Sequence, residues 1–277
     1  MSIAKGKPAM YLAGALMTLG TAIAAFGQEP QEMLVGDKTA DQWAQNLRAD
    51  SLTLRLQAAM MLGDFGPQGK NVVPDLIVAL RDDHYLVRGH AAQALGKIGP
   101  SAREAVGDLI AALNDKEKYV ITRSMLALGR IGPDAKPAVP QLSQSLSDQD
   151  KSIRATAAAA LGLIGPDANQ AIPALCDLLN NTSPEVRLQA AQALALVDPG
   201  NKEAVATLID FVQGPNKHLR LQAVQALAVV GPSAKDALPA LRSLLEDPDQ
   251  AVRDTAAVSI RAIEAKNSSN GSDKQQA

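Results

Sequence analysis

A glycine followed by a proline returns along this chain at a strict interval of 33 residues. The pairs begin at Gly66, Gly99, Gly132, Gly165 and Gly231, and Asp198 with Pro199 replaces the one missing pair. Leucines keep the same interval, in a series that runs through Leu76, Leu109, Leu142, Leu175, Leu208 and Leu241. A fixed period of this length is typical of solenoids, in which each unit packs only on its neighbours. The chain is therefore expected to fold as a stack of similar units.

Each unit predicts two helices. Between Val87 and Ile98 the apolar residues recur at spacings of three and four, which places them on one face of a first helix. Gly99 ends this helix, because glycine adopts the left-handed conformation without steric cost and Pro100 cannot continue a helix. Further prolines stand where a second helix begins, a position at which the missing N–H costs nothing: Pro74, Pro140, Pro173 and Pro239. This pattern predicts an all-α chain of helix pairs.

The ends of the stack are expected to be half-units. Thr39 and Gln42 have the spacing of a capping box, and Trp43 lies one period before Leu76, so the stack opens with a lone second helix. Residues 252–263 continue the apolar rows and predict a lone first helix at the other end. The solenoid is expected over residues 39–266.

Three segments outside the solenoid have their own composition. Lys5 and Lys7 precede an uncharged apolar run that ends in small residues, which predicts a signal peptide over residues 1–27 and export to the periplasm or the cell exterior. The alternative is an uncleaved membrane anchor, because this run is about long enough to span a bilayer. A linker is expected over residues 28–38, and a disordered polar tail over 267–277.

The string from Val87 to Pro100, VRGHAAQALGKIGP, with Asp82 six residues before Arg88, resembles the HEAT repeat in its phycobilisome-lyase-like variant. This resemblance covers residues 39–266 and implies a right-handed α-solenoid of six helix pairs with half-repeat caps. Such repeats occur in scaffolds, adaptors and a few enzymes, so the resemblance is specific for fold and not for function.

The resemblance also implies a ladder of ion pairs between adjacent units. In this chain the pairs would be Asp82 with Arg88, Asp148 with Arg154, and Asp247 with Arg253. Arg187 and Arg220 belong to the same row, but Asn181 and Gly214 replace the acid before them. Ile121 replaces the arginine of the third unit and is expected to leave Asp115 unpaired.

Two enzymatic relatives share this architecture. Deoxyhypusine hydroxylase resembles it and holds two irons with His-Glu pairs directly after the repeat arginine, where this chain has Gly89-His90, Leu188-Gln189 and Leu221-Gln222. Bilin lyases also resemble the repeat, but no distinctive histidine or aromatic cluster is evident here. The sequence therefore predicts no catalytic, metal-binding or cofactor-binding residue and a non-catalytic scaffold or adaptor, with a lyase-like or metal-dependent enzyme or enzyme subunit as the alternative.

Binding is then expected on the faces of the stack. If the second helices line the concave face, its polar positions would include Asp75, Asp108, Gln141, Gln144, Asp177 and Asp210. In this prediction Asp75 with Asp108, and Asp177 with Asp210, face a basic segment of a partner or a cation; the alternative is a solvated helix face.

A small basic patch is expected on the convex side, where His90, Lys97, Arg123 and Arg130 share rows on the first helices. The net charge of −2 offers no general attraction to nucleic acid or anionic lipid. The expected partner is an unidentified protein, with no nucleic acid, no membrane for the mature chain, and a monomeric state.

Overall fold

The computed structural model describes residues 33–264. The predicted signal peptide or anchor, the first five residues of the linker and the polar tail lie outside the described residues. Over the described part of the chain, none of the helices combines the length and apolar character needed to cross a bilayer.

The described residues form helix pairs joined by short 3₁₀ segments, as the repeat predicts, and the predicted all-α solenoid is confirmed. The longer member of each pair is α2 (Leu52–Leu62), α4 (Tyr85–Ile98), α6 (Lys118–Ile131), α8 (Lys151–Ile164), α10 (Pro184–Val197), α12 (Lys217–Val230) and α14 (Gln250–Glu264). The other series is α1 (Ala40–Asn46), α3 (Val73–Ala79), α5 (Val106–Ala111), α7 (Val139–Ser145), α9 (Ile172–Leu178), α11 (Lys202–Gln213) and α13 (Leu238–Ser243).

The Gly-Pro pairs turn the chain as expected, with one refinement. Gly99 has φ 70 and ψ −137, and Gly132 has φ 82 and ψ −141, so φ is positive but ψ lies outside the left-handed helical region. Only glycine reaches this conformation readily, because it has no Cβ. The pairs lie within 3₁₀ segments, which cover Gly63–Val72, Gly99–Ala105, Gly132–Ala138, Gly165–Ala171 and Gly231–Ala237.

The 3₁₀ segments contribute to the core. In the segment over Gly99–Ala105, the side chains of Ala102 and Ala105 are both fully buried. In the fifth unit Asp198 replaces the glycine and no 3₁₀ segment forms; instead the Asn201 side chain accepts a hydrogen bond from the Ala204 N–H and caps α11, which at 12 residues is the longest of its series.

Both predicted half-units are present. Thr39 and Gln42 form the capping box of α1, and Trp43 is buried. A turn over residues 35–38, placed by the sequence in a linker, packs against this end: the Trp43 indole N–H donates to the Val35 carbonyl oxygen at 2.9 Å. At the other end α14 continues the core through Val252, Ala256 and Ile263.

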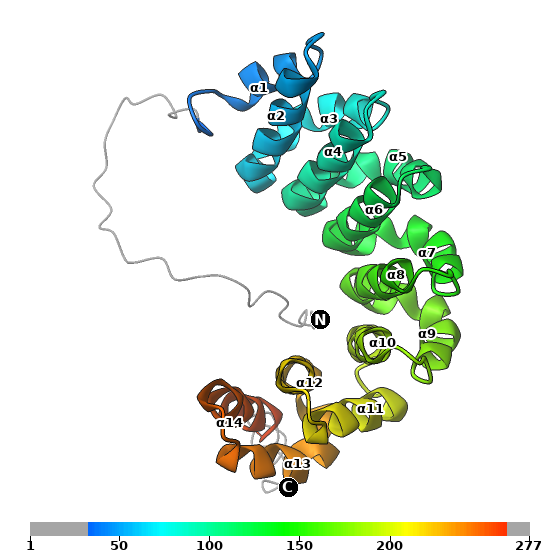
Figure 1. The fold of residues 1–277 in the computed structure, drawn as a ribbon, viewed down its shortest axis with the longest axis vertical. Coiled ribbons are helices and arrows are strands. Elements are labelled where there is room, and N and C mark those ends of the chain that lie inside the picture. Colours follow the sequence, from blue (N-terminus) through cyan, green and yellow to red (C-terminus); the bar gives the residue numbers. More distant parts are fainter. Residues whose placement is uncertain (1–32, 265–277) are drawn as a thin grey trace, which may run out of the picture. The chain divides into compact units, whose positions relative to one another are not determined.

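The two series of helices form two layers of an arc (Figure 1). The longer helices α2 to α14 line its inner, concave side and are called the inner helices; α1 to α13 lie on the convex side and are called the outer helices. The prediction that second helices line the concave face is therefore wrong, because second helices are the outer helices.

Small residues explain the direction of the bend. A Cβ atom on Gly96 would lie 2.8 Å from Ala127 Cα, and one on Gly162 would lie 2.9 Å from Ala193 Cα. Successive inner helices thus meet backbone to backbone, whereas neighbouring outer helices remain further apart. A stack that is thinner on one side must curve toward that side.

Candidate functional site

The residues predicted for a concave binding face lie on the outer helices, and several of them already have partners. Arg48 Nη2 lies 2.7 Å from Asp75 Oδ1, and Arg81 Nη2 lies 2.7 Å from Asp108 Oδ1. One unit further along, Gln141 Nε2 donates to Asn114 Oδ1 at 3.0 Å. Asp75 and Asp108 therefore do not form a free acidic pair, because each is neutralised by an arginine of the preceding unit.

The other three predicted residues of that face are simply exposed. Gln144 lies on α7, Asp177 on α9 and Asp210 on α11, all on the convex side. The predicted convex patch is displaced in the opposite direction. It was expected on the convex side but lies on the inner helices, with His90 and Lys97 on α4 and Arg123 and Arg130 on α6.

An aromatic and basic cluster joins α4 to α6. We call it the tyrosine cluster and define it as Tyr85, His90, Tyr119 and Arg123. The Tyr119 hydroxyl lies 3.3 Å from His90 Nε2, the Arg123 guanidinium carbon lies 5.0 Å from the centre of the Tyr119 ring, and the Tyr85 and Tyr119 rings meet edge to face at 6.4 Å. The Tyr119 side chain is therefore in contact with both an imidazole and a guanidinium.

The cluster exists because Gly89 leaves room for it. A Cβ atom at Gly89 would lie 2.2 Å from a carbon of the Tyr119 ring, which is an impossible contact. The repeat places Leu56 and Ala155 in the same row, so the glycine of one unit and the tyrosine of the next depart from the pattern together. The repeat pattern alone did not predict the contact of Tyr119 with Gly89.

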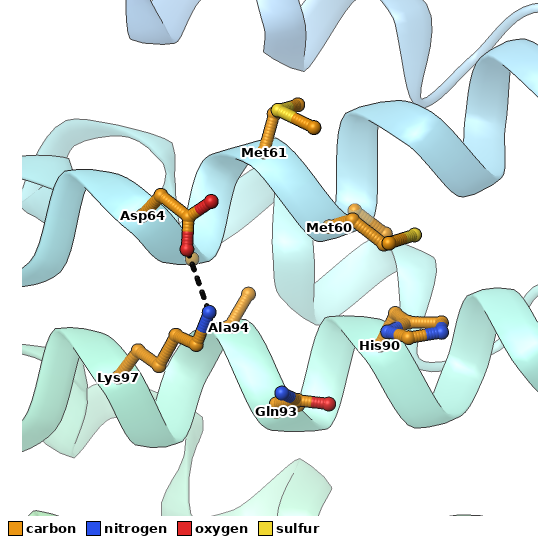
Figure 2. Close-up of a pocket in the computed structure, with 9 residues that line it drawn as sticks. Met60, Met61, Asp64, His90, Gln93, Ala94 and Lys97 are labelled. Atoms are coloured by element: carbon orange, nitrogen blue, oxygen red, sulfur yellow. Dashed lines mark hydrogen bonds and ion pairs between the residues drawn. The ribbon is translucent and has the colours of Figure 1, made fainter. Parts of the chain in front are cut away.

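The environment of His90 favours its neutral form. Burial lowers the pKa of His90 below its ordinary value, and the positive charges of Arg123 and Lys97 lower it further. Figure 2 shows His90, Gln93 and Lys97 following one another along α4, beside a cavity of about 110 Å³ toward α2. Lys97 Nζ closes one end of this cavity through an ion pair of 2.6 Å with Asp64 Oδ1.

A second depression lies over α8, α10 and α12. We call it the inner groove; its cavity of about 310 Å³ is lined by Ala159, Leu163, Gln189, Gln192, Ala195, Leu196, Gln222, Gln225, Ala226 and Val229. Leu163 is 44% exposed and Val229 is 66% exposed. This groove was not predicted, although its signal is present in one row of the repeat: Lys97 and Arg130 are followed, at intervals of 33 residues, by Leu163, Leu196 and Val229.

The arginine ladder is present in a different register. Arg88 Nε and Nη2 donate to the two carboxylate oxygens of Asp115 at 2.7 and 2.9 Å, while Arg88 Nη1 donates to the backbone carbonyls of Asp82 and Asp83. Arg55 and Arg220 do the same: like Arg88, each binds two carbonyl groups of its own loop and the carboxylate of the next unit. The predicted pairs of Arg88 with Asp82, Arg154 with Asp148 and Arg253 with Asp247 are wrong as ion pairs, because in each case the arginine reaches the aspartate carbonyl oxygen.

This register also changes which ion pairs of the ladder, called rungs below, are missing. Arg55 pairs with Asp82, Arg88 with Asp115, and Arg220 with Asp247. Asp115 is therefore paired, contrary to prediction. Three rungs are missing at positions in the same register. Ile121 replaces the arginine opposite Asp148, and Asn181 and Gly214 replace the aspartates opposite Arg154 and Arg187.

Titratable groups elsewhere are dispersed. Within residues 33–264 no three histidine, cysteine or acidic side chains are close enough to hold a metal ion. His84 stacks on Tyr85 with ring centres 5.1 Å apart, and His218 contacts Gln222. Burial raises the pKa of the half-buried Cys176 thiol, and the negative charge of Glu203 raises it further, so this thiol is protonated at neutral pH.

Comparison with known proteins places the chain among helical repeats. The family model described as HEAT repeats matches residues 40–129, 106–195, 139–228 and 205–270. The structure of the complex of CpcE and CpcF of phycocyanin lyase from Nostoc sp. PCC7120 is similar, with 26% sequence identity, a TM-score of 0.59, and coverage of 88% of this chain and 99% of that chain. No curated protein matches the sequence.

Two further solved structures are less similar. An engineered protein has 24% identity and a TM-score of 0.52, with 81% of this chain and 68% of that chain covered, which shows a shared fold alone. Human deoxyhypusine hydroxylase in complex with glycerol has 24% identity and a TM-score of 0.37, with 82% and 84% covered.

The prediction that this chain is not an enzyme is wrong. It rested on the missing His-Glu pairs, which address di-iron chemistry alone, whereas the similarity at 26% identity is to a lyase complex. The prediction also rested on the lack of a distinctive histidine or aromatic cluster in the sequence, and the tyrosine cluster is such a cluster.

Proposed function

Because this chain belongs to the HEAT-repeat family, we propose that it is a scaffold-type subunit of a lyase-like enzyme that binds a partner protein on its concave face. The inner groove is the observation that carries this proposal. Leu163 and Val229 are large apolar side chains left 44% and 66% exposed on one continuous surface. Neighbouring exposed apolar groups of this kind mark interaction sites in soluble proteins.

The likeness to the CpcE and CpcF complex supports the same proposal, since that structure is itself an assembly of two proteins. A surface that is concave and built on rigid helices also suits binding, because the contact residues are held in place before the partner arrives.

Photo-crosslinking in the native cell tests the binding face. A photoreactive amino acid at position 163 or 229 is expected to give a protein adduct of defined mass. The matched control is position 78 on α3, because Val78 is an apolar residue 61% exposed on an outer helix. Adducts at position 78 and none in the inner groove would contradict the proposal.

The tyrosine cluster favours a part in the reaction as well as in binding. Its phenol and imidazole can exchange a proton, and Arg123 can hold an anionic group of a substrate. If the chain acts as bilin lyases do, the purified protein should carry or take up a visible chromophore, and Tyr119→Phe should impair transfer without removing the crosslink at position 163. If the purified protein is colourless and metal-free and takes up no chromophore, the lyase proposal is contradicted. The binding proposal still stands in that case if the crosslink at position 163 forms.

We also propose that the protein is exported. The support is the order of basic, apolar and small residues over positions 1–27. Determination of the N-terminal residue of the mature protein tests this: a chain that begins at Gln28 is expected, and a chain that retains Met1 in the soluble cell interior would contradict it.

A further inference from the structure

We propose that the inner groove and the arginines beside it form one track for an extended peptide segment, acidic at the end over α6 and apolar at every third residue over α8 to α12. This inference rests on the proposed binding of a partner at the concave face and states the chemistry of the bound segment.

The apolar part of the track comes from one row of the repeat. Leu163, Leu196 and Val229 stand at the same position of α8, α10 and α12, and all three line the inner groove. A bound segment therefore meets one apolar contact on each unit, at the spacing of the inner helices.

That spacing selects the conformation of the segment. Helices packed through glycine and alanine lie about 8–10 Å apart, and Gly162 contacts Ala193 backbone to backbone at this point of the stack. Three residues of a polyproline II segment advance about 9 Å and return to the same face. Every third side chain of such a segment thus faces the next residue of the row.

Glutamines beside the row provide partners for the backbone of the segment. Gln189, Gln192, Gln222 and Gln225 line the groove, two from α10 and two from α12. Gln192 donates to the Gln222 carbonyl at 3.4 Å and Gln222 contacts His218, but within residues 33–264 the side chains of Gln189 and Gln225 make no hydrogen bond. A glutamine amide offers both a hydrogen-bond donor and an acceptor. The backbone N–H and C=O groups of an extended segment are free to bind it, whereas those of a helix are already paired with one another.

Charge gives the track its direction. Lys97 is paired with Asp64, but the ion pairs of residues 33–264 include neither Arg123 nor Arg130. Arg130 is exposed and stands one unit before Leu163 in the same row. Arg130, together with Arg123, whose guanidinium stacks on the Tyr119 ring, complements a segment that has carboxylates at that end.

A random dodecapeptide library displayed on phage tests the inference with the full chain as bait. Peptides that bind the natural chain are counter-selected against the double variant Leu163→Asp, Val229→Asp, called the groove variant. The control is Val78→Asp, which introduces the same charge on the convex side. We expect enriched peptides to carry acidic residues at one end and apolar residues at every third position. Their affinity should fall at least about tenfold in the groove variant, and also in Arg130→Glu, and remain unchanged in Val78→Asp.

Four results would overturn the inference. The enriched peptides could lack acidic residues, could have the spacing of an amphipathic helix, or could bind the groove variant equally well. Sedimentation could instead show that the natural chain is a dimer and the groove variant a monomer, in which case a second copy of the chain fills the groove. If the enriched peptides lack this pattern of acidic and apolar residues but the crosslink at position 163 still forms in cells, the inference of an extended segment is refuted and the proposed function is not.

Discussion

Replacement of Arg88 by methionine tests the arginine ladder most directly. The natural side chain is nearly buried; its Nη1 binds two backbone carbonyls and its other nitrogens bind both oxygens of Asp115. Methionine keeps the aliphatic stem but leaves the Asp115 carboxylate nearly buried without its cation. Removing one partner of a buried pair costs about 3–5 kcal/mol, so Arg88→Met is expected to lower the free energy of unfolding by that amount.

The chain offers a matched control in the same row. Arg154 binds the carbonyls of Asp148 and Gln149 at 2.7 and 2.9 Å, but Asn181 stands where the next unit would supply a carboxylate. Arg154→Met therefore loses two hydrogen bonds to neutral acceptors and should cost about 1–3 kcal/mol. Adding Asp115→Asn to Arg88→Met removes the stranded charge and should recover part of the loss.

The difference between the two variants should depend on pH. Burial raises the pKa of Asp115, but the Arg88 guanidinium and the Glu117 N–H lower it by more, so it lies below its ordinary value. The stability that this carboxylate provides is present above about pH 4, its unfolded pKa, and is lost as pH falls through the folded pKa. In Arg88→Met burial instead raises the pKa of the unpaired Asp115 carboxyl, and its protonation removes a buried charge, so the gap between the variants should begin to narrow above about pH 4 and narrow further below it.

Urea unfolding followed by far-UV circular dichroism measures these differences, provided that the slope of the transition is the same in all variants. Equal losses in Arg88→Met and Arg154→Met, or no recovery with Asp115→Asn, would refute the assignment of the rung to adjacent units.

Further predictions concern packing, charge and local stability. Gly129→Ala places a Cβ atom 2.9 Å from Ala160 Cα and should cost about 1–2 kcal/mol in urea unfolding, whereas Gly107→Ala, with nothing within 4 Å, should gain up to about 1 kcal/mol; equal effects would contradict the close packing of the inner helices. Arg123→Gln removes a positive charge that lowers the pKa of His90, so an NMR titration should show this pKa rising, and an unchanged value would show that the charge does not reach the imidazole. Amide hydrogen exchange should be faster in α10 and α11 than in α4, because the ion pairs toward Asn181 and Gly214 are missing, whereas α4 has the pairs of Arg55 with Asp82 and Arg88 with Asp115; uniform protection would be evidence against a stabilising ladder.

The local features of the fold could be predicted because their signals are local. The positive φ of Gly99 follows from the Gly-Pro pair, and the capping box follows from the spacing of Thr39 and Gln42. The buried rows follow from the period of the helix. None of these depends on how one unit is rotated relative to the next.

The features that depend on neighbouring units were predicted less well. Arg88 lies six residues after Asp82 and 27 residues before Asp115, and spacing alone does not say which carboxylate it reaches. Both helix series have apolar faces of the same period, so the concave side was assigned to the wrong one. The signal that could have corrected it was the size of the residues between units, since Gly96 and Ala127 permit an approach that larger side chains forbid.

The difference in thickness between the two layers sets the radius of the arc. Where Gly96, Gly129 and Gly162 meet an alanine of the next unit, one missing methyl group per unit shortens the inner circumference while the outer one is unchanged. The width of the concave opening can therefore be adjusted by exchanging hydrogen for methyl at single positions, with no change in the number of units and none in the residues that face the opening.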